Sequence, residues 1–368
     1  MAEGTGPLAD FRPVRLAALR EALGRADLDG MLVTAPANVR YLTGFSGSSA
    51  LVLVTALEVW LWTDFRYATQ VEEEVGGAAT VRIEPANLWT GLWTALAGMP
   101  SIGRIGFESA HLLHRDFARL LEQGARWQWR PTVDLIETLR ATKDAGEIDA
   151  IRRAVAMAEV ALEQTLASLR PGITEQQVAG MLEGHLREVG SEAFPFPTIV
   201  ASGPRSALPH ARASERRLAP GDLVLIDFGA VADGYCSDIT RTVVLGAAAS
   251  WQREIYAIVL EANRRASGAV RVGMTGKAAD AVARDYIDEC GFGEAFGHSL
   301  GHGIGLDVHE APRLARSIDA SLGPDMVVTI EPGIYRPGLG GVRIEDDVRI
   351  SAEGGERLTH FRRELLEL

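Results

Sequence analysis

The sequence predicts a two-domain protein whose first part is an α/β domain and whose second part carries the chemistry. The chain has 368 residues, more than one domain usually contains. Strands alternate with helices up to about residue 134, which is typical of a sheet covered by helices. After the charged segment 135–148, glycine-flanked acids and histidines become frequent. We therefore expect domains at 1–138 and 139–368.

The first domain is expected to hold a largely parallel or mixed sheet. Leu16, Leu19 and Leu23 recur at helical spacing and predict a helix at 12–26. Two apolar runs, 50–55 and 58–63, predict a hairpin of two strands. The remaining expected elements are a strand at 30–34, a short helical turn at 38–45 ending at Gly44, a helix at 67–74, a strand at 80–83, a helix at 88–96, a strand at 102–108, a helix at 111–123 and an exit at 130–134.

The second domain begins with a long helix. Ile148, Ile151, Val155 and Ala158 give this helix one apolar face. A second helix is expected from 174 to 189, with Gly190 as its C-cap. Helices near 250–270 and 275–290 repeat the pair, and this repetition suggests two related halves.

Composition excludes several classes of protein. The net charge is −12, from 37 basic and 49 acidic residues, which argues against a nucleic-acid surface. The most apolar stretch, 51–62, is too short to span a bilayer. No signal peptide is evident at the N-terminus, and two cysteines are too few for a disulfide framework. We expect a cytoplasmic protein with no nucleic-acid or membrane partner.

Two acids interrupt the apolar runs of segment 223–244. Asp227 lies in Leu-Val-Leu-Ile-Asp-Phe-Gly-Ala and Asp238 in Ser-Asp-Ile-Thr-Arg-Thr, with an Asp-Gly turn at 233–234 between them. If residues 231–234 form the loop, Asp227 lies directly opposite Asp238, with Cβ atoms about 4.5–5.5 Å apart. Two carboxylates at that separation repel each other unless something positive lies between them.

A second segment, 327–348, repeats this arrangement with glutamates. A turn centred on Gly338 would place Glu331 opposite Glu345. The flanking runs Val-Val-Thr-Ile and Gly-Val-Arg-Ile are apolar enough to be buried, and burying an unpaired carboxylate is very costly. The competing interpretation is a surface hairpin with incidental acids, but here the acids interrupt apolar runs instead of alternating with polar residues.

Residues 298–310, His-Ser-Leu-Gly-His-Gly-Ile-Gly-Leu-Asp-Val-His-Glu, hold three of the eight histidines. Gly301, Gly303 and Gly305 would let the backbone pass close to a ligand. Imidazole is a common metal ligand and the usual proton carrier at physiological pH. Taken alone, this stretch also fits a glycine-rich turn with incidental histidines. The carboxylate pairs elsewhere favour a ligand-binding loop.

Four carboxylates and one histidine suit two divalent cations of intermediate hardness. Oxygen-rich ligation with one imidazole favours Mn, Co or Zn over a thiolate-type zinc site. Paired metals lie about 3.5–4 Å apart and share a bridging water or hydroxide. Metal binding lowers the pKa of that water and makes it a nucleophile near neutral pH. The residues therefore predict metal-assisted hydrolysis.

This pattern resembles the five ligands of the pita-bread metallopeptidases, in the same order. The matching positions are Asp227 in Ile-Asp-Phe-Gly-Ala, Asp238 in Ser-Asp-Ile-Thr-Arg-Thr, His302 in Gly-His-Gly-Ile-Gly-Leu-Asp-Val-His-Glu, Glu331 in Glu-Pro-Gly-Ile-Tyr and Glu345 in Val-Arg-Ile-Glu-Asp. Asn-Val-Arg-Tyr-Leu-Thr-Gly-Phe at 38–45 and Thr-Asp-Phe-Arg-Tyr at 63–67 are similar to the creatinase-type N-terminal domain of the proline-specific branch. Methionine aminopeptidases generally lack that domain. The resemblance implies a creatinase-like α/β domain followed by an α+β pita-bread catalytic domain.

The resemblance also implies an activity, which is cleavage of the bond between an N-terminal residue and a following proline. It implies a dinuclear site that usually holds two Mn²⁺. A bridging water would attack the scissile carbonyl, and Glu331 would help to take its proton. His210, in Leu-Pro-His-Ala-Arg, matches a histidine that stabilises the tetrahedral intermediate.

Further roles follow from the same resemblance. His298 and His309 match histidines that line the substrate pocket, and we also count His309 among the catalytic residues. Arg343 matches an arginine that orients the last ligand. Arg313, in His-Glu-Ala-Pro-Arg-Leu, would bind a substrate carboxylate. The implied partners are short proline-containing peptides and a second copy of the chain in a homodimer.

Two alternatives stay open from the sequence. An Xaa-Pro dipeptidase (prolidase) must bind the free carboxylate after proline, whereas an Xaa-Pro aminopeptidase must leave that end open, and the two share their motifs. A metal-free pita-bread protein, either a binding module or a creatine-type amidinohydrolase, is the alternative from another class. Metal-free proteins with this fold lack some of the metal-binding residues, and none of the five is missing from this sequence.

Overall fold

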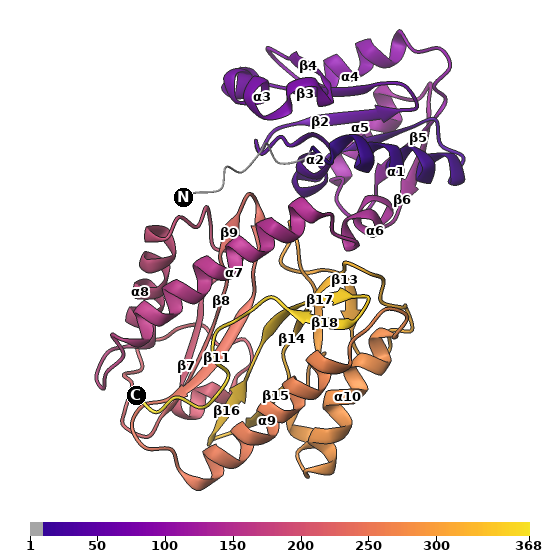
Figure 1. The fold of residues 1–368 in the computed structure, drawn as a ribbon. Helices are drawn as coiled ribbons and strands as arrows, with labels where there is room; N and C mark the ends of the chain where they lie inside the picture. The colour runs from indigo at the N-terminus through magenta and orange to yellow at the C-terminus, as the bar shows by residue number, and fades with distance from the viewer. Residues whose placement is uncertain (1–9) are drawn as a thin grey trace, which may run out of the picture. The chain divides into compact units, whose positions relative to one another are not determined.

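The computed structural model describes residues 10–368, and the chain divides into two compact units, Met1–Arg140 and Ala141–Leu368 (Figure 1). The boundary expected after residue 138 falls within helix α6 (Leu135–Ala141). Within residues 10–368, no helix is both long and apolar enough to cross a membrane.

The first unit is built on a six-stranded mixed sheet with strand order β4-β3-β2-β1-β5-β6. Its strands are β1 Gly30–Val33, β2 Leu51–Thr55, β3 Val59–Thr63, β4 Thr80–Ile83, β5 Arg104–Glu108 and β6 Gln128–Thr132. The predicted hairpin is confirmed, because β2 pairs antiparallel with β3 and Leu51 lies opposite Trp62. The prediction of a mixed sheet is confirmed as well, with β1–β5, β5–β6 and β3–β4 parallel.

Two details of the first unit differ from the prediction. The segment expected as an exit at 130–134 instead contains the end of β6. This strand lies at the edge of the sheet, where proline is tolerated although Pro131 has no backbone N–H to donate. The helix expected from residue 111 begins at His114. The helices of this unit are α1 Arg12–Arg25, α2 Pro36–Thr43, α3 Ala68–Val75, α4 Leu88–Ala97 and α5 His114–Gln123, with 3₁₀ turns η1 Phe65–Tyr67 and η2 Gly76–Ala78.

The second unit contains two helix pairs, as the sequence suggested. Helix α7 (Ala145–Leu166) packs on α8 (Glu175–Glu188), and α9 (Ser250–Ala269) packs on α10 (Gly276–Glu289). Helix α7 begins with a capping box, in which Asp144 and Glu147 each bond to the other's backbone N–H. Short 3₁₀ turns, η3 Gly203–Ala207 and η4 Gly293–Ala295, lie in connecting segments.

The strands of the second unit form two main sheets, with orders β11-β8-β7 and β13-β12-β14-β17-β18, and two hairpins, β9-β10 and β15-β16. Their bounds are β7 Ile199–Ser202, β8 Leu223–Phe228, β9 Val231–Ala232, β10 Tyr235–Cys236, β11 Ile239–Val244, β12 Gly301–Gly303, β13 Glu310–Leu314, β14 Val327–Ile330, β15 Gly333–Arg336, β16 Gly340–Arg343, β17 Asp346–Ser351 and β18 Gly354–Arg357.

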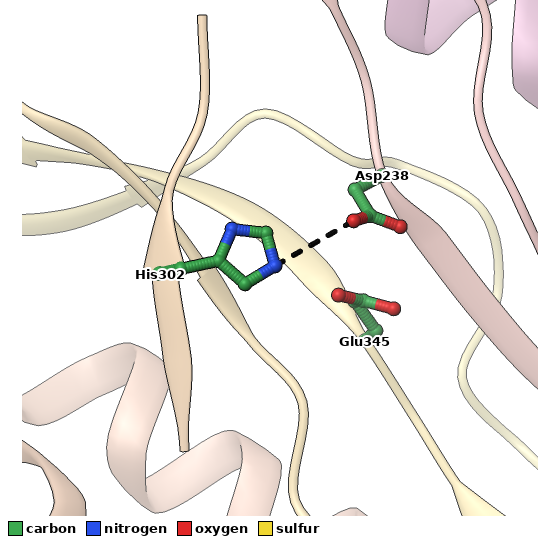
Figure 2. Close-up of side chains that lie close together, drawn as sticks. All are labelled: Asp238, His302 and Glu345. Carbon is green, nitrogen blue, oxygen red and sulfur yellow. Dashed lines mark ion pairs between the residues drawn. The ribbon is translucent and has the colours of Figure 1, made fainter. Parts of the chain in front are cut away.

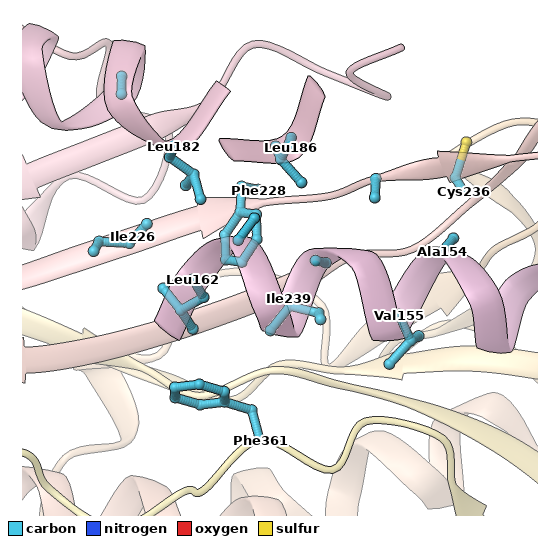
Figure 3. Close-up of a cluster of buried hydrophobic side chains, with 14 of the residues drawn as sticks. Ala154, Val155, Leu162, Leu182, Leu186, Ile226, Phe228, Cys236, Ile239 and Phe361 are labelled. Atoms are coloured by element: carbon cyan, nitrogen blue, oxygen red, sulfur yellow. The ribbon is translucent and has the colours of Figure 1, made fainter. Parts of the chain in front are cut away.

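The apolar face of α7 packs against the strands that carry the first acid pair. Leu162 of α7, Phe228 of β8 and Ile239 of β11 are fully buried in one cluster (Figure 3). A second cluster joins α9 and α10 to β14 and β17. Because both faces of these strands are covered, their polar side chains are buried with them.

The register of β8 against β11 corrects one prediction. Asp227 lies opposite Thr240, not opposite Asp238. The loop is shorter than assumed, because Asp233 and Gly234 have φ of 48° and 75° and form a two-residue turn. The pairing therefore shifts by two residues. Since side chains alternate with a period of two, Asp227 and Asp238 still share one face as diagonal neighbours.

The glutamate pair has the predicted register. Ile330 pairs with Asp346 and Gly333 with Arg343, so Glu331 falls opposite Glu345. The backbone N–H of Glu345 also donates to the carbonyl of Thr240 at 3.1 Å. This bond joins the glutamate-bearing strands to the aspartate-bearing strands and places the four acids together.

Candidate metal centre

The predicted metal ligands come from neighbouring strands of the second unit. They are Asp227 on β8, Asp238 just before β11, His302 in the middle of β12, Glu331 directly after β14 and Glu345 between β16 and β17. Figure 2 shows Asp238, His302 and Glu345 pointing towards one another from three separate segments of the chain. Each of these three offers a ligand atom within 4.8 Å of the others. Residues more than a hundred positions apart therefore meet at one point.

His302 is held with a free lone pair facing the acids. Burial lowers the pKa of this histidine to about 4, so its ring is neutral near pH 7. Its Nδ1 lies 3.0 Å from the carbonyl oxygen of Gly303, which can only accept, so Nδ1 carries the proton. Nε2 therefore presents its lone pair at 3.7 Å from Asp238 Oδ2 and 3.6 Å from Glu331 Oε1. With both carboxylates ionised these atoms are all acceptors, and a cation between them satisfies all three.

The carboxylates are buried and incompletely paired. Within residues 10–368, Oδ1 of Asp227 and Oδ1 of Asp238 have no hydrogen-bond partner. Burial and the negative charge of Glu345 raise the pKa of Asp238 well above its usual range. Burial and the charge of Asp227 raise the pKa of Glu345 to about 8. Orphaned, mutually repelling carboxylates around a neutral imidazole fit bound divalent cations.

Arg343 and Thr240 fix the orientation of two of these acids. Arg343 donates from Nη2 to Asp227 Oδ2 and from Nε to the hydroxyl oxygen of Thr240 at 3.0 Å. That hydroxyl in turn donates to Oε2 of Glu345 at 2.6 Å. Asp347 adds a further contact, because its Oδ2 accepts from the backbone N–H of Asp238 at 3.1 Å. Residues that hydrogen-bond to metal ligands in this way fix the orientation of the ligands and tune their affinity for the metal.

The carboxylate cluster opens into a cavity of about 810 Å³. Every residue that the sequence suggested for the site lines this cavity: His210, Asp227, Asp238, His298, His302, His309, Arg313, Glu331, Arg343 and Glu345. Another part of its wall is apolar and consists of Phe196, Pro197, Ile199, Pro209, Ala211 and Ala213. The volume suits a small peptide or another drug-sized ligand.

The pocket histidines differ in their surroundings. His298 is neutral near pH 7, because burial lowers its pKa to about 4. Its Nδ1 lies 2.8 Å from the carbonyl of Ser299 and carries the proton, so Nε2 accepts from the hydroxyl of Tyr335 at 2.9 Å. The ring of His309 lies 4.4 Å from that of His302, in an edge-to-face arrangement. Burial lowers the pKa of His309 as well.

Sequence reasoning missed several residues of the site. Tyr335 stands in the Glu-Pro-Gly-Ile-Tyr motif and links His298 to Arg343, whose Nη1 donates to the tyrosine oxygen at 2.9 Å. Arg212 lines the cavity two residues after His210. Position within a motif was an available signal for both. Thr240 and Asp347 gave none, because their roles depend on contacts between strands distant in sequence.

A buried, oxygen-rich donor set with one histidine, open to a peptide-sized cavity, is the kind of site that metal-dependent hydrolases use. Comparison with known families is consistent with this class. The model of metallopeptidase family M24 matches residues 149–352, and the model of the creatinase/prolidase N-terminal domain matches residues 15–142. The chain belongs to metallopeptidase family M24, so it is a hydrolase that acts on peptide bonds.

Individual relatives agree over nearly the whole chain. The uncharacterized peptidase YqhT of Bacillus subtilis (strain 168) is 41% identical over 355 residues, covering 96% of this chain and 100% of the relative. The structure of an Xaa-Pro dipeptidase from Bacillus anthracis matches with a TM-score of 0.93 at 41% identity, covering 97% of this chain and 100% of that one. An X-Pro aminopeptidase from Thermotoga maritima MSB8 matches with a TM-score of 0.89 at 37% identity, covering 96% and 99%. The predicted two-domain fold is thereby confirmed.

Proposed function

We propose that the chain is a dinuclear metallopeptidase that hydrolyses the bond between an N-terminal residue and a following proline. The observation that carries this proposal is the neutral Nε2 of His302, which faces the buried carboxylate of Asp238 and the half-buried carboxylate of Glu331 in the lining of the cavity. Xaa-Pro peptidases among the similar structures support the choice of bond.

Two divalent cations would be held by Asp227, Asp238, His302, Glu331 and Glu345. When bound, such cations supply Lewis acidity and lower the pKa of water, as metal ions do in hydrolases generally. The oxygen-rich donor set favours Mn²⁺, with Co²⁺ or Zn²⁺ as substitutes. Glu331 is placed to accept the proton of the attacking water, because it lines the cavity and, among residues 10–368, its carboxylate accepts a single hydrogen bond, a long one of 3.4 Å from the Thr329 hydroxyl to Oε1.

The rest of the cavity would bind and orient the peptide. The apolar wall that includes Phe196 and Ile199 suits the proline ring, since a hydrophobic surface binds an apolar ring without leaving polar groups unpaired. His210, His298 and His309 line the same cavity and would contact the scissile carbonyl and its neighbours. A histidine that donates to the developing oxyanion stabilises the transition state.

We further propose that dipeptides are the preferred substrates. Arg212 and Arg313 both line the cavity, and both are exposed enough to meet a ligand. Guanidinium groups recognise carboxylates with paired hydrogen bonds. The free carboxylate that follows proline in a dipeptide fits this charge, whereas a longer peptide carries an amide at that position. A homodimer stays a prediction from family resemblance, and a cytoplasmic location stays a prediction from the sequence composition.

The test compares an Xaa-Pro dipeptide with an Xaa-Pro-Yaa tripeptide, each with Mn²⁺ and with chelator. Metal-dependent cleavage of the dipeptide alone supports a dipeptidase. Equal or better cleavage of the tripeptide makes the protein an aminopeptidase. Cleavage of neither, with metal bound, removes the proline specificity. A chain that binds no metal and cleaves neither peptide would instead be the metal-free binding module or amidinohydrolase.

A further inference from the structure

A buried ion pair on helix α10 holds the backbone that carries His298. Asp280 and Arg284 lie one helical turn apart, and their side chains are 1% and 9% exposed. Arg284 donates from Nε to Asp280 Oδ2 at 2.6 Å and from Nη2 to Asp280 Oδ1 at 2.7 Å. This is a two-pronged contact of the kind that fixes a guanidinium plane.

The other donors of Arg284 reach the segment 296–300. Nη1 donates to the carbonyl of Phe296 at 2.8 Å, and Nη2 donates to the carbonyl of His298 at 2.7 Å. Asp280 also bonds this segment, because its Oδ1 accepts from the backbone N–H of Leu300 at 3.0 Å. The backbone on both sides of the catalytic-pocket histidine is therefore bonded to one ion pair.

The aromatic contacts of this segment reinforce the same arrangement. The guanidinium carbon of Arg284 lies 4.1 Å from the centre of the Phe296 ring, which meets the His298 ring edge to face at 5.1 Å. The His298 ring then reaches Tyr335 through Nε2 at 2.9 Å. Arg284 thus contacts the backbone of His298 directly and its ring through Phe296.

A buried ion pair is weak support for stability, since apolar replacements often leave stability unchanged. The hydrogen bonds of this pair go to a segment that contributes His298 and Ser299 to the active-site cavity. Asp280 and Arg284 themselves do not line that cavity. Supporting residues of this kind hold a functional side chain in its orientation without taking part in the chemistry themselves.

We propose that Asp280 and Arg284 are positioning residues for His298, and that turnover depends on them through the orientation of this histidine. The inference rests on the proposed contact of His298 with the peptide. Neither residue lines the cavity proposed to hold the peptide. Arg284→Lys keeps the positive charge beside Asp280 but cannot hold both carbonyls in the fork geometry of a guanidinium.

The first arm of the test follows the ring of His298 by NMR, independently of activity. Protein with ¹⁵N-labelled histidine rings is loaded with diamagnetic Zn²⁺, and the His298 signal is assigned by its loss in His298→Gln. In Arg284→Lys we expect this signal to move towards the average of the two tautomers. The signal of His185, whose Nδ1 bonds Thr165 at 2.9 Å on α7, serves as an internal reference and stays in place.

The second arm is a double-mutant cycle on kcat/KM for an Xaa-Pro dipeptide. Arg284→Lys is expected to lower kcat/KM about tenfold in the wild-type background and less than about twofold in His298→Gln, since residues acting through one contact are not additive. Asp280→Asn, which still accepts from Leu300, should show a smaller loss. Ala283→Gly, at a fully buried neighbouring position on α10, is the matched control, because it weakens the helix but removes no side-chain hydrogen bond to the segment 296–300.

The outcomes separate this proposal from the proposed function. An unmoved His298 signal in Arg284→Lys, or an equal movement in Ala283→Gly, overturns the positioning role. An equal loss of kcat/KM in both backgrounds also overturns it, because the pair then acts on structure in general. If the wild-type chain cleaves no Xaa-Pro peptide, the proposed function fails, and the NMR arm alone still decides whether the ion pair orients His298.

Discussion

Thr240 of β11 donates a hydrogen bond of 2.6 Å from its hydroxyl to Oε2 of Glu345, which lies between β16 and β17. The same hydroxyl oxygen accepts from Nε of Arg343 at 3.0 Å. Thr240 lies opposite Asp227 in the sheet. One buried hydroxyl therefore ties a glutamate ligand to the strand pair that carries the aspartates.

Removing that hydroxyl should weaken metal binding. Thr240→Val keeps the shape of the side chain but leaves Oε2 of Glu345 unrestrained, so we expect metal affinity to fall about 10–100-fold. Titration against a competing chelator measures the change. Thr242→Val is the matched control, because Thr242 is equally buried two residues along β11 and, among residues 10–368, its hydroxyl bonds backbone atoms of Arg343 and no carboxylate. An equal loss of affinity in both variants contradicts the assigned role.

The ligand substitutions His302→Ala and Asp238→Ala should each abolish turnover while the chain stays folded. Each substitution removes one candidate metal ligand from the cluster and buries no new charge. Circular dichroism checks folding, and hydrolysis of an Xaa-Pro dipeptide checks activity. Wild-type activity in either variant would show that the site has been assigned to the wrong residues.

Stability of the metal-free protein should fall as pH rises through neutrality. Glu345 has an ordinary pKa of 4.5, and its folded pKa is raised to about 8. Between these values the folded chain holds a proton that the unfolded chain has released. Unfolding therefore becomes easier with increasing pH across this window.

Thermal unfolding of chelator-treated protein at pH 5.5 and pH 8 measures this effect. The midpoint should be lower at pH 8, and added metal should raise it more at pH 8 than at pH 5.5, because bound cations favour the ionised carboxylates. A midpoint of the metal-free protein that rises with pH would contradict the buried, repelling acids described here.

Packing of α7 on the acid-bearing strands should be a main source of stability in the second unit. Leu162→Ala removes a fully buried side chain from the cluster with Phe228 and is expected to cost about 2–5 kcal/mol. Val160→Ala is the control on the same helix, because Val160 is 49% exposed and its replacement should change stability by less than about 0.5 kcal/mol. Denaturant unfolding measures both, and equal costs would contradict this packing.

Local signals in the sequence predicted much of the fold. Two successive apolar runs marked the β2–β3 hairpin, and Gly44 marked the end of α2, where φ is +84°. The turn centred on Gly338 also placed Glu331 opposite Glu345 correctly. Strand β6 was missed because Arg130 and Pro131 break the apolar pattern that identifies a strand.

The site was harder to predict wherever it depends on long-range contacts. The Asp227–Asp238 register was wrong because the loop length was assumed to be four residues, whereas the Asp-Gly turn needs only two. The contacts of Thr240 with Glu345 and of Arg284 with His298 join segments whose pairing no local pattern shows. Spacing can suggest which residues are ligands, but it does not indicate what orients them.

The most direct test of the account is the metal content of the wild-type chain beside His302→Ala, measured by elemental analysis after dialysis against Mn²⁺. The account predicts two metal ions per wild-type chain, fewer in His302→Ala, and Xaa-Pro hydrolysis that follows the metal content and disappears with chelator. A wild-type chain that binds no metal, or that cleaves an Xaa-Pro peptide equally well in chelator, would contradict the dinuclear metallopeptidase.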